Sequence, residues 1–271
     1  MNPAWNENSL DTLCAGLCYA LGIDAPKCAA AANKELTDFV DSAFGGEKVD
    51  RVFMYNPDAI AQWVYEKYAH LLSEVKTRTE LELPLCAVMP SVTPVCFGTM
   101  YTGAQPEVHG IKAYVKPVIT IDTIFDALLR SGKKPAIVST AGDSLSLIYL
   151  GREMDYFICE TVEEVNAKAA DLILKDEHDF IVVYNGNYDS VMHKYGPESR
   201  EALGELRANA RTFGMFDAMI AEHWKGHNSL IGFAMDHGCH EIDGDCGSHG
   251  LDMEEDLNIL HLYKVYPAEE D

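Results

Sequence analysis

Positive charge is scarce in this chain. Its 271 residues include 21 Lys and Arg against 43 Asp and Glu, which gives a formal net charge of −22. Such a balance repels polyphosphate backbones over long range and argues against a nucleic acid polymer as partner. Lys and Arg form no cluster that could hold a phosphate group. A substrate with phosphate would therefore need positive charge from another source, and a bound metal ion is one such source.

Long hydrophobic runs are also missing. No apolar stretch approaches the ~18 to 20 residues of a membrane span. The first ten residues, "MNPAWNENSL", lack both the positive charge and the apolar run of a secretory signal. We therefore expect a soluble, cytoplasmic protein that does not use a membrane as partner.

Closely spaced cysteines are absent. The eight cysteines are Cys14, Cys18, Cys28, Cys86, Cys96, Cys159, Cys239 and Cys246. Cys14 and Cys18 are one helical turn apart, and Cys239 and Cys246 flank an acidic loop, but neither pair has CxxC spacing. We expect most of these residues to be reduced core thiols rather than parts of a structural zinc site.

Short apolar runs alternate with segments of helical period. The runs that indicate strands are residues 51–55, 83–89, 134–140, 155–160, 180–184, 229–235 and 259–265. Helical patterns cover residues 58–72, 123–132, 161–176 and 198–226. This alternation predicts an α/β fold with a mostly parallel sheet sandwiched by helices.

Two helical patterns, residues 9–23 and 27–44, precede the first strand. We expect one domain over residues 1–271, with residues 1–50 as a helical extension or cap and residues 51–271 as the catalytic core. The extension could also be a dimer arm, so a homo-oligomer through these helices is a further expectation.

Polar side chains follow four of the expected strands. They are Asn56 and Asp58; Ser91 and Thr93; Asp189 and His193; and, in the last group, Asp236, His237 and His249. In open α/β sheets the ligand site lies beyond the carboxyl ends of the strands. Taken singly, each motif has an ordinary explanation: a surface pair at positions 189 and 193, a helix cap at 236 and 237, and a solvated loop at 249. Together they form the mixed nitrogen and oxygen ligand set that zinc accepts, and two such groups suit a pair of divalent ions.

Thr93 lies in "PSVTPVCFGTMYTGAQPEVHGI", residues 90–111, between a valine and a proline. A threonine hydroxyl is a poor nucleophile alone, and a divalent cation nearby makes its alkoxide accessible near neutral pH. If a helix begins near Pro94, its free N–H groups would also face an anionic substrate. Thr93 is therefore a candidate nucleophile.

This stretch resembles the nucleophile loop of the alkaline phosphatase superfamily, in particular the type I phosphodiesterase and nucleotide pyrophosphatase branch. Three later segments resemble the same branch in order and spacing: "DSVMHKYGP", "MDHG" and "GSHG". The resemblance spans roughly residues 50–250. It implies an alkaline-phosphatase-like fold and two divalent metal ions, Zn²⁺ with Mn²⁺ as the alternative.

Carried over to this sequence, the resemblance implies one metal held by Asp189, His193 and His249. It implies a second metal held by Asp236 and His237 together with Thr93, whose oxygen is the nucleophile. His109 is expected to pack within the loop. His240 is close enough in sequence to bind substrate, although it has no counterpart in the family's motifs.

Two positions depart from the family's pattern. The first metal aspartate usually occurs as Asp-Gly, whereas this chain has "YNPDAIAQ". Asp58 is our choice for this ligand, and Asn56 is its rival. The second departure is Cys96, where the diesterase branch commonly has an asparagine that donates to a phosphate oxygen. A thiol is a weaker donor, and the preference for substrate is open as a result.

The sequence thus predicts a phosphoric ester hydrolase with a phosphothreonine intermediate, acting on small phosphodiesters or nucleotide pyrophosphates. Cys96 and His240 are the expected substrate-binding residues. The alternatives are a phosphomonoesterase, a phosphonate or sulfate hydrolase, and a metal-binding homologue with weak catalysis.

Overall fold

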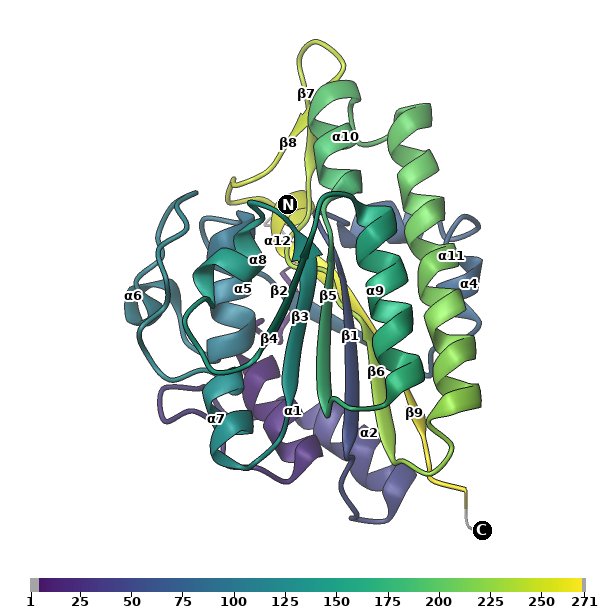
Figure 1. Cartoon of the computed structure of the whole chain (residues 1–271). Helices are drawn as coiled ribbons and strands as arrows, with labels where there is room; N and C mark the ends of the chain where they lie inside the picture. Colours follow the sequence, from purple (N-terminus) through teal and green to yellow (C-terminus); the bar gives the residue numbers. More distant parts are fainter. Residues whose placement is uncertain (1–4, 270–271) are drawn as a thin grey trace.

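A computed structural model describes residues 5–269, and in it a seven-stranded sheet lies between two layers of helices (Figure 1). The sheet strands are β1 (Arg51–Pro57), β2 (Leu81–Cys86), β3 (Pro135–Thr140), β4 (Asp155–Cys159), β5 (Phe180–Asn185), β6 (Ser229–Phe233) and β9 (Asn258–Tyr266). A separate hairpin consists of β7 (His240–Ile242) and β8 (Cys246–Ser248). Each of the seven strands expected from the apolar runs is present.

The longer helices are α1 (Thr12–Leu21), α2 (Lys34–Phe44), α5 (Thr93–Thr102), α9 (Val162–Lys175), α10 (Asn187–Tyr195) and α11 (Arg200–His223). The shorter ones are α3 (Gln62–Lys67), α4 (Ser73–Lys76), α6 (Pro106–His109), α7 (Ile124–Arg130), α8 (Ser144–Ile148) and α12 (Glu254–Leu257). Within residues 5–269, none of the helices combines the length and the apolar character needed to cross a membrane.

The strands are arranged in the order β2-β9-β6-β1-β5-β3-β4. β9 is antiparallel to both of its neighbours, and the remaining pairs are parallel. The predicted mostly parallel sheet is thereby confirmed. Strand β5, "FIVVYN", is buried along its whole length, since it lies between β1 and β3 with helices on both faces.

Helices α9 and α11 cover one face of the sheet, and α1, α5 and α7 cover the other (Figure 1). Most of helix α1 is buried, and its Leu13 and Leu17 belong to the main hydrophobic core. The helix therefore packs as part of a layer and leaves little surface for a partner. Helix α2 buries only Leu36, Val40 and Phe44.

The expectation of core thiols holds for half of the cysteines. All eight are free of disulfides; Cys14, Cys18, Cys96 and Cys239 are buried, and the other four are partly exposed. Burial raises the pKa of the Cys96 thiol. These side chains pack as small apolar groups.

Helix α5 begins at Thr93, with Pro94 in its first turn, and ends at Gly103, whose φ is +70°. Proline suits the first turn because its missing N–H is not needed there. Gly103 suits the end because a left-handed conformation strains other residues, and an added Cβ would lie 2.6 Å from Ala29 Cβ. Gly98 faces the His109 ring, where a Cβ would approach within 2.9 Å. The expectation that His109 packs within the loop is confirmed.

The helix predicted over residues 58–72 is wrong at both ends, because α3 covers only Gln62–Lys67. Ala59 has a φ of +60°, a left-handed conformation that no α-helix continues. The Asp58 amide donates to the Asn185 carbonyl at 2.9 Å, which ties the chain to the end of β5. This turn takes the Asp58 side chain out of a helix and leaves it at the end of the sheet.

Candidate active site

The carboxyl ends of β6, β1 and β5 are neighbours in the sheet, and each delivers a carboxylate. Asp236 follows β6, Asp58 follows β1, and Asp189 lies in the first turn of α10, directly after β5. Figure 1 shows α10 and the β7–β8 hairpin above this end of the sheet. The hairpin brings His249 back toward it.

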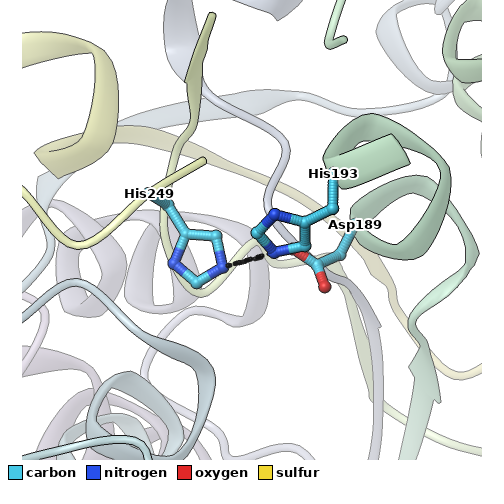
Figure 2. A group of neighbouring side chains, drawn as sticks. All are labelled: Asp189, His193 and His249. Carbon is cyan, nitrogen blue, oxygen red and sulfur yellow. Dashed lines mark hydrogen bonds and ion pairs between the residues drawn. The ribbon is translucent and has the colours of Figure 1, made fainter. Parts of the chain in front are cut away.

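Asp189, His193 and His249 form the first cluster (Figure 2). His193 Nε2 lies 3.2 Å from Asp189 Oδ1, and His249 Nε2 lies 3.3 Å from the same oxygen. The Nδ1 atoms donate to carbonyls, that of His193 to Gly247 at 3.0 Å and that of His249 to Ser91 at 2.9 Å. Since a carbonyl can only accept, each neutral ring keeps its lone pair on Nε2, the atom that faces the cluster.

Asp58, Asp236 and His237 form the second cluster, and all three side chains are buried. His237 Nε2 lies 3.3 Å from Asp58 Oδ1 and 3.4 Å from Asp236 Oδ2. His237 Nδ1 donates to the Gly238 carbonyl at 2.9 Å, so this ring also turns its Nε2 lone pair inward. The ring centroids of His237 and His249 are 4.1 Å apart, and the two clusters are adjacent.

Both clusters have the spacing of a metal site. Ligand atoms at 2.0 to 2.1 Å from a tetrahedral ion lie about 3.3 Å from one another. The close contacts between candidate ligand atoms within the two clusters run from 3.1 to 3.4 Å. Among the described residues, Asp58 Oδ1, Asp189 Oδ1 and Asp236 Oδ2 are buried oxygens with no hydrogen-bond partner. Buried oxygens of this kind are costly unless a cation compensates them. The donor set therefore fits two divalent ions.

The pKa values show the same need for positive charge. Burial, and then the charge of Asp189, raises the pKa of Asp58 to about 7. Burial, and then the charge of Asp58, raises the pKa of Asp236. In His237, burial and the neighbouring His249 lower the pKa. The hydrogen bond with Asp189 raises the pKa of His193 to about 9, so a proton is favoured where a cation would otherwise sit.

Thr93 is the first residue of α5 and lies against the second cluster. Its Oγ1 is 3.3 Å from His237 Nε2 and 3.4 Å from Asp58 Oδ2. The hydroxyl is buried at the N-terminal end of the helix. Pro94 has no N–H, and the Val95 and Cys96 amides both donate to the Val92 carbonyl at 3.0 Å. An anion in front of Thr93 would therefore face mainly the positive end of the helix dipole.

The structure brings Asp58, rather than Asn56, into the cluster. Asn56 is fully buried, and its side chain donates to the Ala234 carbonyl at 2.7 Å and accepts from the Tyr101 hydroxyl at 2.7 Å. These contacts tie β1 to the end of β6 and to α5. The amide is thus occupied by cross-links within the core.

The two expected substrate-binding residues lie in other surroundings. Cys96 is buried, and its thiol points to the Val88 carbonyl at 3.9 Å. His240 begins β7, and its Nδ1 lies 2.7 Å from Asp256 Oδ1. Both side chains are largely buried, so contact with a substrate would require them to move. Their substrate-binding roles remain predictions.

Tyr184, which the sequence did not single out, joins the site. Its hydroxyl donates a short hydrogen bond to Asp58 Oδ2 and leaves Oδ1 toward the cluster. Its position at the end of β5 could have identified it as a candidate site residue. The β7–β8 hairpin was also missed, although its Asp243-Gly244 turn between two short runs is a typical hairpin sequence.

A protein-family profile matches part of this chain. The profile of the family described as type I phosphodiesterase / nucleotide pyrophosphatase matches residues 136–266, just under half of the chain. Five of the clustered residues lie inside this segment, namely Asp189, His193, Asp236, His237 and His249. Asp58 and Thr93 lie outside it. Comparison with curated proteins by sequence gives no significant match.

Solved structures share the fold. Murine ectonucleotide pyrophosphatase / phosphodiesterase 5 is 17% identical with a TM-score of 0.55, and the match covers 72% of this chain and 58% of that protein. Phosphonoacetate hydrolase from Sinorhizobium meliloti is 19% identical with a TM-score of 0.54, covering 75% of this chain and 61% of that one. The chain thus spans about three fifths of the length of these proteins.

The fold is that of the alkaline-phosphatase-like α/β proteins, with a mostly parallel sheet flanked by helices. The resemblance inferred from the motifs is confirmed as well: the chain resembles the alkaline phosphatase superfamily, in its nucleotide pyrophosphatase and phosphodiesterase branch. The class of enzyme that these comparisons indicate, a phosphoric ester hydrolase, is the class that the sequence predicts.

Proposed function

We propose that this protein hydrolyses phosphate esters with Thr93 as the nucleophile and two divalent metal ions, Zn²⁺ or Mn²⁺, as cofactors. The observation that carries the proposal is the position of Thr93 Oγ1, 3.3 Å from His237 Nε2 and 3.4 Å from Asp58 Oδ2, at the start of a helix. Phosphodiesters and nucleotide pyrophosphates are the first substrate class.

Asp189, His193 and His249 would hold one ion, and Asp58, Asp236 and His237 the other. When bound, the ions would lower the pKa of a nearby hydroxyl and offset negative charge on the phosphoryl oxygens. Tyr184 holds Asp58 Oδ2 through its hydroxyl, which fixes the carboxylate's orientation. The carbonyls of Gly247, Ser91 and Gly238 fix the three rings in the tautomer that a metal ligand needs.

In the first step Thr93 Oγ1 attacks phosphorus, a new O–P bond forms, and the ester P–O bond breaks. The leaving alcohol departs with a proton. The positive end of the α5 dipole faces the phosphoryl oxygens and favours the added negative charge. Water then cleaves the phosphothreonine, releases the phosphoryl group and restores the Thr93 hydroxyl.

A test compares Thr93→Ala with Thr93→Ser after reconstitution with Zn²⁺ or Mn²⁺, using chromogenic phosphodiesters and phosphomonoesters. The alanine variant should lose turnover and keep its metal, since Thr93 is one contact among several, and the serine variant should keep part of the turnover. Acid quenching should trap a phosphorylated Thr93 in the wild type. Substantial turnover by the alanine variant would refute the covalent mechanism.

Two alternatives remain. Cys96, in place of the asparagine of the diesterase branch, leaves the substrate preference open, so a phosphomonoesterase or a phosphonate or sulfate hydrolase is one alternative, and the same substrate panel ranks these classes. A metal-binding homologue with weak catalysis is the other alternative. It would hold both ions and release no product from any of the esters.

A further inference from the structure

A cavity of about 630 Å³ opens beside the first cluster. Asp189 and Tyr184 form part of its wall, so it is continuous with the candidate active site. The rest of the wall comes from the loop at residues 114–116, from the loop after β3 and from the start of α9. The organic part of a phosphate ester bound at the clusters has room in this cavity.

The wall is acidic. Asp143, Glu160, Glu163 and Asp189 line the cavity, and Lys116 is the single Lys or Arg among its lining residues in the described chain. Lys116 Nζ donates to the Gly142 carbonyl at 2.7 Å. The Asp143 carboxylate caps α8, where it accepts from the amide and the hydroxyl of Ser146, and Asp189 is assigned to a metal.

Glu160 and Glu163 are the remaining carboxylates of the wall, and Glu163 lies in the first turn of α9, where the helix dipole offsets part of its charge. Both are exposed, and neither forms an ion pair with Lys, Arg or His within residues 5–269. Tyr114 also lines the cavity with 60% of its surface exposed, and Lys116 Nζ lies 5.4 Å from its ring centroid. This ring thus already faces one cation, as aromatic faces commonly do.

We propose that this cavity binds the organic group of the substrate and that Glu160 and Glu163 make it select cationic or neutral groups over groups that carry additional phosphates. The inference rests on the proposed function, because the metal clusters are what would hold the phosphoryl group. The physical reason is charge: a second phosphate in the cavity would meet two carboxylates, whereas an ammonium group would be attracted by both.

The experiment uses three diesters with the same leaving group, p-nitrophenol, so that the bond broken is identical. They are the p-nitrophenyl ester of phosphocholine, the p-nitrophenyl ester of thymidine 5′-phosphate, and the latter with a 3′-phosphate. For the wild type, kcat/KM should fall in that order. The effect should shrink as salt is raised, since exposed charges are screened beyond about 10 Å at 0.1 M.

Glu160→Gln and Glu163→Gln should each reduce the preference for the choline ester over the 3′-phosphorylated ester by about two- to five-fold at low salt, as expected for exposed charge pairs. The double variant should reduce it further. Glu177→Gln is the matched control, because Glu177 is an exposed carboxylate at the opposite end of α9, and it should leave the preference unchanged.

Equilibrium dialysis of the same esters with Thr93→Ala gives a readout without turnover, and the dissociation constants should follow the same order. If the diesters are hydrolysed at rates that do not depend on the charge of the organic group, this inference is wrong and the proposed function stands. The same holds if the enzyme shows a preference that the glutamate variants do not alter. Release from none of the three diesters would overturn the diesterase proposal and this inference with it.

Discussion

His193 Nε2 and His249 Nε2 face each other at 3.1 Å, although both rings donate from Nδ1 to backbone carbonyls (Figure 2). Two lone pairs at that separation repel unless a positive charge lies between them. A proton can supply it, since the hydrogen bond with Asp189 raises the pKa of His193 to about 9. A divalent cation supplies it better, because Asp189 Oδ1 lies beside both nitrogens.

The first prediction is therefore that metal ions stabilise the fold. Zn²⁺ or Mn²⁺ added to chelator-treated protein should raise Tm by several degrees, since free ion at a hundred times its Kd adds about 2.7 kcal/mol. Isothermal titration calorimetry should give two sites. His193→Ala should weaken one of them, and His223→Ala, at an exposed position on α11, serves as the control. An unchanged Tm would contradict a preformed metal site.

The second prediction separates Asp58 from Asn56. Asp58→Asn replaces an anionic ligand by a neutral one and should lower affinity for one metal by at least about 10- to 100-fold, the range for disturbing a metal site's support. Asn56→Ala should keep both metals and lower the free energy of unfolding by about 1 to 3 kcal/mol, because it orphans buried groups at Ala234 and Tyr101. Metal content after dialysis and urea unfolding measure the two effects. The reverse pattern would make Asn56 the ligand.

The third prediction concerns the β7–β8 hairpin. A Cβ at Gly247 would lie 2.3 Å from Met192 Sδ and 2.8 Å from the Met192 carbonyl oxygen, so Gly247→Ala must push the hairpin away from α10. His193 would lose its carbonyl acceptor, and affinity at the first cluster should fall while the second is kept. Calorimetric titration measures both sites.

Gly204→Ala is the control for this change. Gly204 lies in α11 with open space around the added Cβ, and alanine there should leave metal binding unchanged and stabilise the helix by up to about 1 kcal/mol. Equal metal affinities in wild type and Gly247→Ala would show that the hairpin does not position the first cluster.

The fourth prediction is a pH dependence from His261. This residue is fully buried, donates from Nε2 to the Met235 carbonyl at 2.6 Å, and has its pKa lowered by burial to about 4. Because the folded pKa lies below the ordinary value of about 6.5, protonation favours the unfolded state. The contribution of neutral His261 to the free energy of unfolding is complete above about pH 6.5 and is lost progressively as the pH falls toward 4.

Between pH 7 and pH 5 the wild type should lose about 2 kcal/mol of unfolding free energy through this residue. His261→Gln should lack that component, whereas His70→Gln, at an exposed site, should keep it. Urea unfolding with a chelator present measures the difference without a contribution from metal release. Identical pH profiles for the wild type and His261→Gln would refute this assignment.

Much of the fold was readable from local patterns. A continuous apolar run such as β5 is stable only when both of its faces are buried, which indicates a central strand. The side chain of Thr161 accepts from the Glu164 amide and caps α9 at the expected start. The start of α3 was not readable, because helical periodicity in residues 58–72 cannot reveal the left-handed turn at Ala59. That turn depends on the contact between Asp58 and Asn185 across neighbouring strands.

The sequence by itself determined the residue types and the strand ends that carry them, since hydrophobic period and motif spacing are local properties. Only the tertiary structure decided which ends meet. The order β6-β1-β5 places Asp236, Asp58 and Asp189 side by side, although they lie far apart in the chain. It also decided between Asp58 and Asn56 as the residue that faces the cluster. Strand β1 ends at Pro57, and the left-handed turn at Ala59 carries Asp58 out of the strand, whereas the Asn56 amide stays bonded to the Ala234 carbonyl of the neighbouring chain segment.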